Sequence, residues 1–508
     1  MKRALILGLG ESGLAMARWL ARASWQLRVA DTRAEPPMLE QLRLQVPQAQ
    51  FVAGSFEIEQ LEGVDLLAVS PGLSIHTEPV RSLLKAAQQR AIDVVGEIEL
   101  FARALQQLRR ERSYAPIVVG VTGTNGKTTT VRMVAAMMER WGRSVVVAGN
   151  ISPSALDALR AALEPQRLPD VWVLELSSFQ LATTKSLVCT AAAVLNVTQD
   201  HLDWHESFED YAASKAKIFA PDTNFVFNRD DPVSRQMRSQ NGRGTSFGEA
   251  APEGAGEFGL VREAGLTWLA CTDEELVPRR RRRAGGDVGG ALSTGEPRLV
   301  HRLMPVDALA VRGTHNAMNA LAALALYRAV GGPLAPSLRA LSEFRTEPHR
   351  TETVARINGV EYVDDSKGTN VGATVAALRG LSDSFGGARR ILVILGGDGK
   401  GQAFEPLAAA VRAHARAVLL IGKDAARIGQ ALQGVDVSMT FAKDLPAAVR
   451  AAAAIAQPGD IVLLSPACAS FDAFRNYAHR AEVFVAAVRQ IESSAGVGAN
   501  VRPVESAS

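Results

Sequence analysis

A segment in the second hundred residues has the composition of a nucleotide-binding loop. In IVVGVTGTNGKTTT (117–130), a short apolar run leads into a glycine-rich turn that closes on Lys127 and Thr128. Glycines allow backbone amides to point at phosphate oxygens, the lysine adds a positive charge, and the threonine hydroxyl can bind Mg²⁺. The first glycine stands one residue too early for the strict G-x-x-x-x-G-K-[ST] spacing. The pattern therefore predicts a variant phosphate loop for a nucleoside triphosphate, and the alternative is a glycine-rich turn without a ligand.

Two later strand ends supply candidate metal ligands. VWVLELSS (171–178) places four apolar residues before Glu175, and phosphate-loop enzymes need an acid on a neighbouring strand to hold Mg²⁺. AAAVLNVTQDHLDWH (191–205) then delivers Asp200, His201, Asp203 and His205. For Glu175 we favour metal binding over the alternative of a solvated strand end. For the four later residues, two interpretations are equal: one of them binds a metal ion, or all are packed or surface residues. Lys215 and Lys217, on the helix expected over 211–219, have the pattern of solvated charges.

The beginning of the chain contains a second anion-binding pattern. Residues 4–7 (ALIL) indicate a buried parallel strand that runs into Gly8-Leu-Gly10-Glu-Ser-Gly13 and then into a helix. This is the context of a dinucleotide fingerprint, and Asp31 ends the next strand, where a ribose-binding acid is expected, with Arg33 close behind. The pattern indicates a nucleotide diphosphate at a helix N-terminus and leaves open whether the nucleotide is NAD(P). A tight turn with a purely structural role is the alternative.

The composition is that of a globular protein with several domains. The chain has 508 residues, of which 47% are hydrophobic and 21% charged, with a net charge of +3, so neither nucleic acid nor membrane is favoured as a partner. Its three cysteines show no metal or disulfide spacing, which favours a reducing cytosol. The apolar run near Met1 is too short for a signal peptide, and no segment approaches about 18 uninterrupted apolar residues. We therefore expect a cytoplasmic protein without membrane insertion.

Strands and helices alternate along most of the chain. Strands are expected at VDLLAVS, DVVG and SVVVAGN, and later at VEYVDDS, RRILVILGG, AVLLIG and GDIVLLSPA. Helices are expected over 97–114, 313–332 and roughly 472–490. Such alternation predicts parallel sheets with helical cover. We expect an α/β fold of three domains: a Rossmann-like domain (1–96), a central phosphate-loop ATPase-like domain (97–346) and a C-terminal Rossmann-like domain (347–508).

Polar loops follow the C-terminal strands. They contain DDSKGTN, GGDGKG and LSPACAS, which bring Lys367, Lys400 and Ser470 to strand ends. Because parallel sheets bind ligands at the carboxyl ends of their strands, these residues are candidates to bind a small anion. Solvated loop lysines are an equal alternative.

Residues 240–300 are loop-like in composition. We expect a solvated surface insertion there, with a low-complexity part near 277–297. The arginine run Arg279–Arg283 lacks interleaved aromatic residues, so we favour solvated charge over a nucleic-acid patch.

Taken together, the motifs resemble those of the Mur ligases of peptidoglycan synthesis. The resemblance is carried, in family order, by GxGxxG, TGTNGKTT, AGNI, LELSSFQL, LNVTQDHLD, the Lys215 helix, HNxxNALAA, PHR, DDSKGTN, GGDGKG and LSPACASFDxF. It covers the chain outside 240–300 and the C-terminal tail, and it is strongest with the D-glutamate-adding branch. It implies an ATP-dependent ligase that joins D-glutamate to UDP-N-acetylmuramoyl-L-alanine through an acyl phosphate. ATP and Mg²⁺ at two sites are the implied cofactors, and a monomer acting on small molecules is expected.

The resemblance also implies roles for individual residues. The ATP site would comprise Gly123, Asn125, Gly126, Lys127, Thr128, Thr129, Asn316, Asn319, His349, Arg350 and Asp365. The UDP-substrate site would comprise Gly10, Ser12, Gly13, Asp31, Thr32, Arg33, Ser70, Pro71, Gly72, Asn150, Ser177 and Gln180. The D-glutamate site would comprise Lys367, Thr369, Lys400, Ser470, Phe471 and Tyr477. The metal ligands would be Thr128, Glu175, His201 and Lys215, and the catalytic residues Lys127, Glu175, His201 and Lys215.

Lys215 matches the lysine that CO₂ carbamylates in this family, a modification that turns an ammonium into a carboxylate-like ligand. Two positions depart from the common family residues without affecting the interpretation: Tyr477 stands where Phe is frequent, and Gly368 where Ala is frequent.

Other functions remain as alternatives. A sister ligase could add L-alanine or the third residue of the peptide, although the Asp-Asn-Pro-Arg signature for a diamino acid is absent. A folylpolyglutamate synthase would not need the N-terminal unit. An NADP-dependent dehydrogenase would leave Lys127 unexplained, and a non-catalytic nucleotide-binding regulator would not need the full set of metal and lysine positions.

Overall fold

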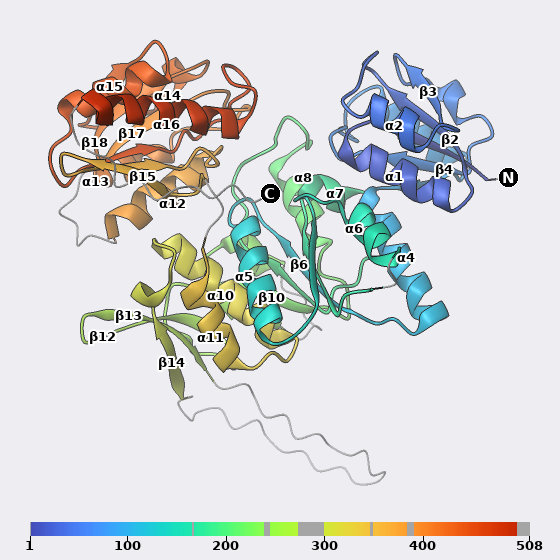
Figure 1. The fold of residues 1–508 in the computed structure, drawn as a ribbon, viewed down its shortest axis with the longest axis horizontal. Coiled ribbons are helices and arrows are strands. Elements are labelled where there is room, and N and C mark those ends of the chain that lie inside the picture. The colour runs from blue at the N-terminus through green and yellow to red at the C-terminus, as the bar shows by residue number, and fades with distance from the viewer. Residues whose placement is uncertain are drawn as a thin grey trace, which may run out of the picture. The chain divides into compact units, whose positions relative to one another are not determined.

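The computed structural model describes residues 2–164, 167–237, 244–272, 299–345, 349–383 and 391–494. They form three β-sheets with helical cover, which confirms the predicted α/β class (Figure 1). The chain divides into two compact units: one from residues 1–197, 212–310 and 317–344, the other from residues 198–211, 311–316 and 345–508. No helix in the described ranges is long and apolar enough to cross a membrane. The three-domain division stays a prediction, and its second boundary falls at residues outside the described ones.

The N-terminal sheet is fully parallel, with the order β3-β2-β1-β4-β5. Its strands are β1 (Arg3–Leu7), β2 (Gln26–Asp31), β3 (Gln50–Ala53), β4 (Leu66–Val69) and β5 (Asp93–Val95). Its helices are α1 (Glu11–Arg22), α2 (Leu39–Gln45) and α3 (Val80–Gln89), with a short 3₁₀ turn at Ile58–Leu61. The strand order reverses between β1 and β4, and ligands of such sheets bind at that point.

The central sheet has nine strands in the order β14-β13-β12-β11-β10-β9-β6-β8-β7. They are β6 (Ile117–Thr122), β7 (Val145–Gly149), β8 (Val171–Glu175), β9 (Ala191–Val194), β10 (Asn224–Asn228), β11 (Gly244–Phe247), β12 (Phe258–Glu263), β13 (Leu266–Thr272) and β14 (Val300–Pro305). The accompanying helices are α4 (Glu97–Arg112), α5 (Lys127–Arg140), α6 (Ala155–Leu163), α7 (Ser178–Ala182), α8 (Phe208–Ala216), α9 (Pro232–Gln236), α10 (Thr314–Ala329) and α11 (Leu334–Glu343). The strands and helices predicted around the phosphate loop are thereby confirmed.

The expectation of a surface insertion over 240–300 is wrong for its described part. Strands β11, β12 and β13 extend the central sheet, and β12 pairs antiparallel with β13. The hairpin turns at Ala264 and Gly265, whose φ angles of 50° and 78° give the left-handed backbone that tight hairpins require. The glycine-rich stretch before β12 concealed the alternating pattern that follows it. The expected low-complexity part at 277–297 and the Arg279–Arg283 run lie outside the described residues.

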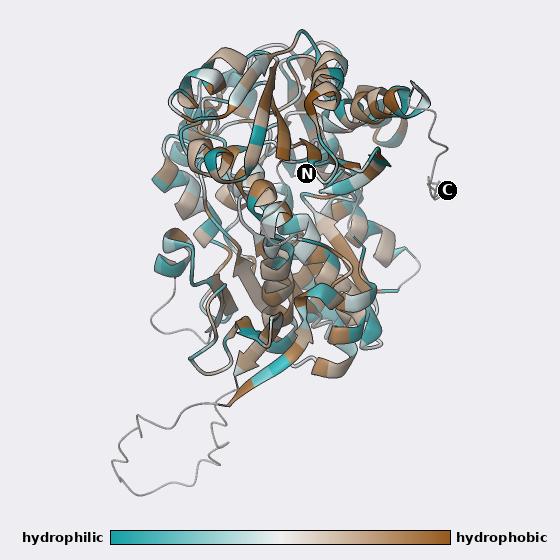
Figure 2. Ribbon diagram, turned by 90° about the vertical axis from the view of Figure 1, so that its left-hand side faces the viewer, coloured by the Kyte–Doolittle hydropathy of each residue, from teal (hydrophilic) through white to brown (hydrophobic). Residues whose placement is uncertain are grey.

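The C-terminal sheet has the order β15-β16-β20-β17-β18-β19, parallel except for β15. Its strands are β15 (Glu352–Ile357), β16 (Val360–Asp364), β17 (Ile391–Gly396), β18 (Ala415–Ile421), β19 (Ser438–Phe441) and β20 (Ile461–Leu464). Its helices are α12 (Val371–Asp383), α13 (Leu407–His414), α14 (Ala425–Ala431), α15 (Leu445–Ile455) and α16 (Tyr477–Ser494). Alternate residues of β17 enter separate apolar clusters, so both faces of the sheet are covered. Figure 2 shows brown, apolar colouring on parts of several strands and mixed colouring along the helices.

Candidate active site

The phosphate loop lies between β6 and α5 as predicted. Gly126 caps α5 with a φ of 86°, and an added Cβ there would lie 2.3 Å from Oδ1 of Asn319. Only glycine therefore fits, and Asn319 lies against the loop. The Lys127 ammonium folds back on the loop and donates to the carbonyl oxygens of Gly123 (2.9 Å) and Thr124 (3.0 Å). The first-turn amides of α5 and this lysine make the loop a cradle for an anion.

Glu175 and Lys215 are buried in the same unit. Glu175, at the end of β8, is 4% exposed; its Oε1 accepts from Asn150 Nδ2 at 2.9 Å, and its Oε2 has no hydrogen-bond partner among the described residues. Lys215, on α8, is 2% exposed and donates to the Gly123 carbonyl at 2.9 Å. Lys215 is therefore not the solvated charge that its pattern suggested, whereas Lys217 does lie at the surface and donates to Ala182 O. Two ammonium groups thus converge on one loop carbonyl.

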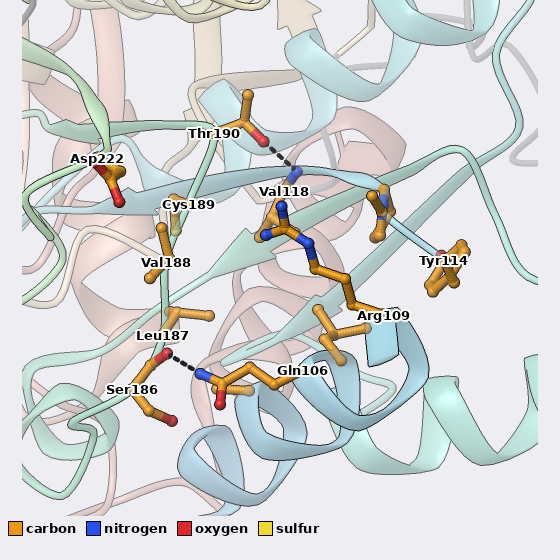
Figure 3. Close-up of a pocket in the computed structure, with 14 residues that line it drawn as sticks. Gln106, Arg109, Tyr114, Val118, Ser186, Leu187, Val188, Cys189, Thr190 and Asp222 are labelled. Carbon is orange, nitrogen blue, oxygen red and sulfur yellow. Dashed lines mark hydrogen bonds between the residues drawn. The ribbon is translucent and has the colours of Figure 1, made fainter. Parts of the chain in front are cut away.

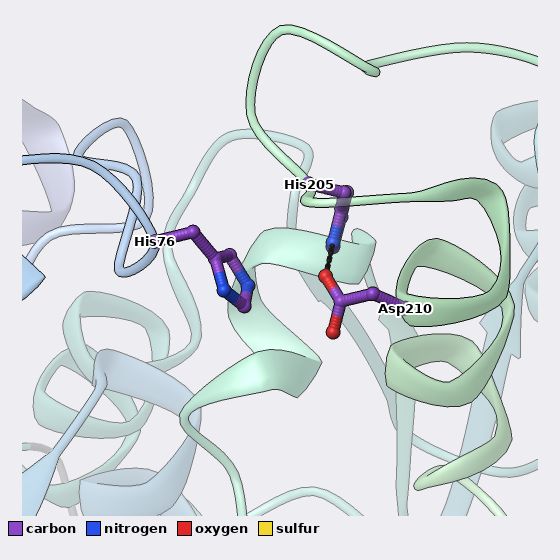
Figure 4. A group of neighbouring side chains, drawn as sticks. All are labelled: His76, His205 and Asp210. Atoms are coloured by element: carbon purple, nitrogen blue, oxygen red, sulfur yellow. Dashed lines mark hydrogen bonds and ion pairs between the residues drawn. The ribbon is translucent and has the colours of Figure 1, made fainter.

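The segment after β9 separates its two histidines by environment. His205 is buried and pairs through Nδ1 with Asp210 Oδ2 at 2.7 Å (Figure 4). Its ring also packs on the rings of Trp204 and Tyr211. The side chain of His201 is 35% exposed, and its Nε2 lies 3.7 Å from Asp200 Oδ2. His205 thus has the environment of a packed core residue, and His201 is the histidine of this pair with an accessible ring.

The fingerprint of the N-terminal sheet is held together by Asp31. Its Oδ2 accepts from Leu9 N at 2.7 Å, and both its oxygens accept from the Arg33 guanidinium at 2.8 Å. Burial raises the pKa of the Asp31 carboxyl, but the bonds from Arg33 and from backbone amides outweigh it and lower the pKa to about 2. Ser70 Oγ, at the end of β4, donates to Gly8 O at 2.7 Å. The structure therefore gathers the β1 loop, Asp31, Arg33 and Ser70 at the reversal of strand order.

The remaining residues predicted for the UDP substrate fall on nearby loops and helix starts. A Cβ on Gly13 would lie 2.0 Å from Gly8 O, so the close approach of α1 to the loop requires glycine. Ser177 and Gln180 form a reciprocal capping box at the start of α7, a structural role that the sequence interpretation missed. Gly10 caps α1, Ser12 lies in α1, and Thr32, Pro71 and Gly72 lie in the loops after β2 and β4.

The residues predicted for D-glutamate surround the ends of β16, β17 and β20. Lys400 Nζ pairs with Asp200 Oδ1 at 3.0 Å, and Asn370 Nδ2 donates to the other oxygen of Asp200 at 3.1 Å. The Lys367 ammonium lies 5.4 Å from the centroid of the Tyr477 ring. Ser470 is buried, Phe471 is 77% exposed, and Thr369 lies in the loop before α12.

Asp365 and His349 share this region of the second unit. Burial raises the pKa of Asp365 to about 7, against the hydrogen bond from Ser465 Oγ (2.7 Å) and the charge of Arg350. His349 Nδ1 bonds Asp364 Oδ2 at 2.7 Å, and this bond raises the pKa of His349. Asn316, also predicted for ATP, is buried and donates to Arg312 O at 2.8 Å.

An arginine in this region was missed by the sequence interpretation. Arg480 of α16 is fully buried and donates to Ser366 O (2.8 Å) and Cys468 O (3.1 Å). It therefore ties the DDSKGTN loop to the LSPACAS loop. Burial lowers the pKa of its guanidinium to about 10. The only sequence signal was an arginine at a position where the helix pattern expects an apolar residue.

A cavity of about 520 Å³ lies at the opposite ends of the central strands. It is bounded by α4, the segment 186–190 and Asp222, with Gln106 Nε2 bonded to Ser186 O and Val118 N to Thr190 Oγ1 (Figure 3). None of the predicted site residues is among the described residues that line it. The residues predicted for ATP and metal binding in this unit lie instead at the carboxyl ends of the central strands.

The fold and the phosphate loop define an α/β phosphate-loop enzyme, and family models narrow the class. The MurD-like N-terminal domain of Mur ligases matches residues 2–96, the Mur ligase middle domain matches residues 121–260, and the glutamate ligase domain of Mur ligases matches residues 349–468. The chain belongs to the Mur ligase family.

Its relatives include proteins named UDP-N-acetylmuramoylalanine–D-glutamate ligase. The protein from Ralstonia nicotianae is 54% identical over 97% of this chain and 98% of its own length. That from Cupriavidus pinatubonensis is also 54% identical, with the same coverage. Solved structures share the fold at low identity: MurC from Thermotoga maritima (18% identity, TM-score 0.54, 97% of this chain and 100% of that one) and MurF from Thermotoga maritima with ADP (17%, TM-score 0.55, 84% and 96%).

Proposed function

We propose that this protein joins D-glutamate to UDP-N-acetylmuramoyl-L-alanine, with ATP converted to ADP and phosphate, in the synthesis of peptidoglycan precursors. The observation that carries the proposal is 54% identity, over nearly the whole of both chains, to a protein named for that reaction. The phosphate loop with its two converging lysines supports it independently. We further propose that the protein acts in the cytoplasm as a monomer.

The chemistry requires an activated carboxyl group. A carboxylate is a poor acyl donor, so the oxygen of the UDP-linked alanine would attack the γ-phosphorus of ATP, giving an acyl phosphate and ADP. The uncharged amine of D-glutamate would then attack the acyl carbon, and phosphate would leave as the amide forms. Lys127 would offset the negative charge that accumulates between the two anions, as in other phosphoryl transfers. No serine or cysteine nucleophile is needed.

The residues present fit a magnesium ion. A buried carboxylate oxygen without a hydrogen bond is costly, and Oε2 of Glu175 is in that state among the described residues. Thr128, buried at the start of α5, supplies a hydroxyl oxygen. Glu175 and Thr128 would hold Mg²⁺, which would neutralise phosphate charge when bound. Carbamylated Lys215 and His201 are proposed from the family resemblance as ligands of a second ion.

The carbamylation proposal for Lys215 is compatible with its burial. A buried lysine loses its proton more readily than an exposed one, and only the uncharged amine reacts with CO₂. The carbamate nitrogen keeps one hydrogen, whereas its oxygens are acceptors. The one remaining N–H of the carbamate could still donate to the Gly123 carbonyl, while its oxygens would be available to a metal ion.

The direct test is release of phosphate with each UDP-muramoyl precursor against a panel of amino acids that includes both glutamate enantiomers. We expect release only with the alanyl precursor and D-glutamate. Release with unmodified UDP-N-acetylmuramate and L-alanine, or with the dipeptide precursor and a diamino acid, would assign the chain to a sister activity. No release with any pair would refute the proposal.

A further inference from the structure

Asn196, just beyond the end of β9, bonds the phosphate loop from outside. Asn125 N donates to Asn196 Oδ1 at 2.8 Å, and Asn196 Nδ2 donates to Asn125 O at 3.1 Å. The carbonyl oxygen of Asn196 accepts from Thr124 N at 2.9 Å. One residue therefore contacts three main-chain groups in the first half of the loop.

The location of this contact follows from the topology of the central sheet. β6 pairs with β8 on one side and with β9 on the other, so the order of connections reverses between β6 and β9. Such a reversal opens a crevice at the carboxyl ends of the two strands. Asn196 and the loop after β6 meet there, and a Cβ added to Gly123 would lie 3.0 Å from Cβ of Leu195. Gly123 has a φ of 150°, which other residues rarely adopt, so the loop conformation needs support from its surroundings.

The strand that carries Asn196 is itself fixed on its other side. Asn228 Nδ2 donates to Leu195 O at 2.9 Å, and Ser234 Oγ donates to Val194 O at 2.8 Å. Val197 N donates to Asp231 Oδ2 at 2.9 Å. The residues around Asn196 are therefore held by β10 and the start of α9. Because Asn196 is bonded to the phosphate loop, these contacts also restrict the movement of the loop.

We propose that Asn196 is a positioning residue that preorganises the phosphate loop for the triphosphate. The amides of Thr124 and Asn125 point at Asn196, so they act as scaffold, and the phosphate contacts fall to Gly126 and the first turn of α5. The inference rests on the proposed function only in taking ATP as the bound anion. Donors that are already oriented cost no reorganisation on binding. Losing the hydrogen bonds between Asn196 and the loop residues Thr124 and Asn125, here called the Asn196 clamp, should therefore weaken nucleotide binding.

The test compares Asn196→Ala with a matched control, Asn224→Ala. Asn224 also bonds the main chain next to β9, donating to Thr190 O at 2.9 Å, but at the opposite end of the strand from the loop. We expect Asn196→Ala to raise the Kd for ADP and the KM for ATP about tenfold, the effect of losing two ordering hydrogen bonds. Both variants should lower the Tm by similar amounts, but Asn224→Ala should leave the Kd for ADP and the KM for ATP unchanged. Affinity for the UDP substrate should change less than threefold in either variant, by the same reasoning.

Asn196→Asp separates the hydrogen bond that the Asn196 side chain accepts from the one that it donates. The carboxylate still accepts from Asn125 N, but it replaces the donor to Asn125 O with a negative oxygen beside the phosphate site. We therefore expect nucleotide binding at least as weak as in Asn196→Ala. Wild-type nucleotide affinity in both Asn196 variants, or an equal loss in Asn224→Ala, would overturn the inference, because Asn196 would then be only structural.

Hydrogen exchange tests the same inference in the unmodified protein, so it does not depend on whether a variant folds. We expect the amides of Thr124 and Asn125 to be protected in the absence of nucleotide; exchange at the rate of an open loop would overturn the proposal. ADP binding and exchange need no ligase activity. If wild-type protein shows no D-glutamate-dependent phosphate release, the proposed function fails and these measurements still decide the role of Asn196.

Discussion

The carboxyl ends of the central and C-terminal strands are both rich in charged residues, but the charges are satisfied differently. At the central sheet, Lys127 and Lys215 donate to the neutral carbonyl of Gly123, and Glu175 keeps a buried oxygen without a hydrogen bond among the described residues. At the C-terminal sheet, cations already meet carboxylates, as in Lys400–Asp200 (3.0 Å) and Lys423–Asp398 (2.9 Å).

This difference distinguishes two kinds of ligand site. The carbonyl oxygens of the loop hold the Lys127 ammonium in place, so an anion that enters the central loop meets a positive charge that is already oriented. A lysine already paired with a carboxylate must exchange partners, so a ligand gains less from it and depends more on shape. If the proposed sites are correct, we therefore expect the central site to contribute more charge stabilisation and the C-terminal site to depend more on shape.

Removing a central lysine should have the largest effect. Lys127→Ala should lower ATP-dependent phosphate release by about a thousandfold or more, the loss typical of a group that stabilises transition-state charge. Binding of the UDP substrate should be nearly unchanged, because its proposed site is on the N-terminal sheet. Phosphate release and UDP-substrate affinity would be measured together. Wild-type turnover in this variant would remove the phosphate-loop assignment and the comparison built on it.

Lys215→Ala should follow, with a loss of about a hundredfold in turnover, as expected when a metal-holding group is lost. If Lys215 acts as a carbamate, an added short carboxylic acid should restore part of the activity, since it supplies the missing oxygens. Lys217→Ala is the control, because Lys217 lies two residues further on, is exposed and donates to the carbonyl of Ala182. Full activity of Lys215→Ala without an additive would exclude a catalytic role.

The sequence predicted the strands and the phosphate loop because apolar runs, glycines and a terminal lysine are local signals. It missed the β12–β13 hairpin because loop-like composition preceded it. It placed the last helix too early: Ala473 N and Phe474 N bond to Ser470 O in a turn, and α16 begins at Tyr477. The burial of Lys215 and the Asn196 clamp could not be predicted from residue patterns, since both depend on contacts between distant segments.

Two buried glutamates of α4, Glu97 and Glu99, also differ in how many hydrogen bonds their carboxylates accept, and their pKa values shift in opposite directions. Burial raises the pKa of Glu97 to about 7, despite a hydrogen bond from Leu156 N. Glu99 is also buried, but amides of Lys185 and Ser186 and the Arg103 guanidinium outweigh burial and lower its pKa. Because folding raises the pKa of Glu97 from its ordinary value of 4.5 to about 7, the unfolded state ionises first, and stability falls as the pH rises from about 4.5 to about 7.

Glu97→Gln should therefore gain stability relative to wild type as the pH rises from about 4.5 to about 7, by on the order of 3 kcal/mol, and the gain should stay constant at higher pH. Glu99→Gln should show the opposite dependence: the stability contributed by ionised Glu99 is present above its ordinary pKa and disappears as the pH falls below it. Thermal unfolding of the three proteins from about pH 3 to about pH 8 would measure this, because the Glu99 contribution changes below its ordinary pKa and the Glu97 contribution above its ordinary pKa. Parallel Tm curves for both variants would contradict the assignment of opposite pKa shifts.

The smallest effect should come from a cation–π contact at the proposed D-glutamate site. Tyr477, 37% exposed, lies with its ring 5.4 Å from the Lys367 ammonium. A cation–π contact at a partly exposed site contributes about 0.5–1 kcal/mol, so Tyr477→Ala should raise the KM for D-glutamate only about threefold to fivefold. Tyr477→Phe keeps the ring and should match wild type. Phe441→Ala, at an exposed aromatic of the same unit, is the control for losing surface area. If Tyr477→Phe weakened D-glutamate binding as much as Tyr477→Ala, the hydroxyl would be the binding group, and the C-terminal site would depend on a directed hydrogen bond instead of the ring.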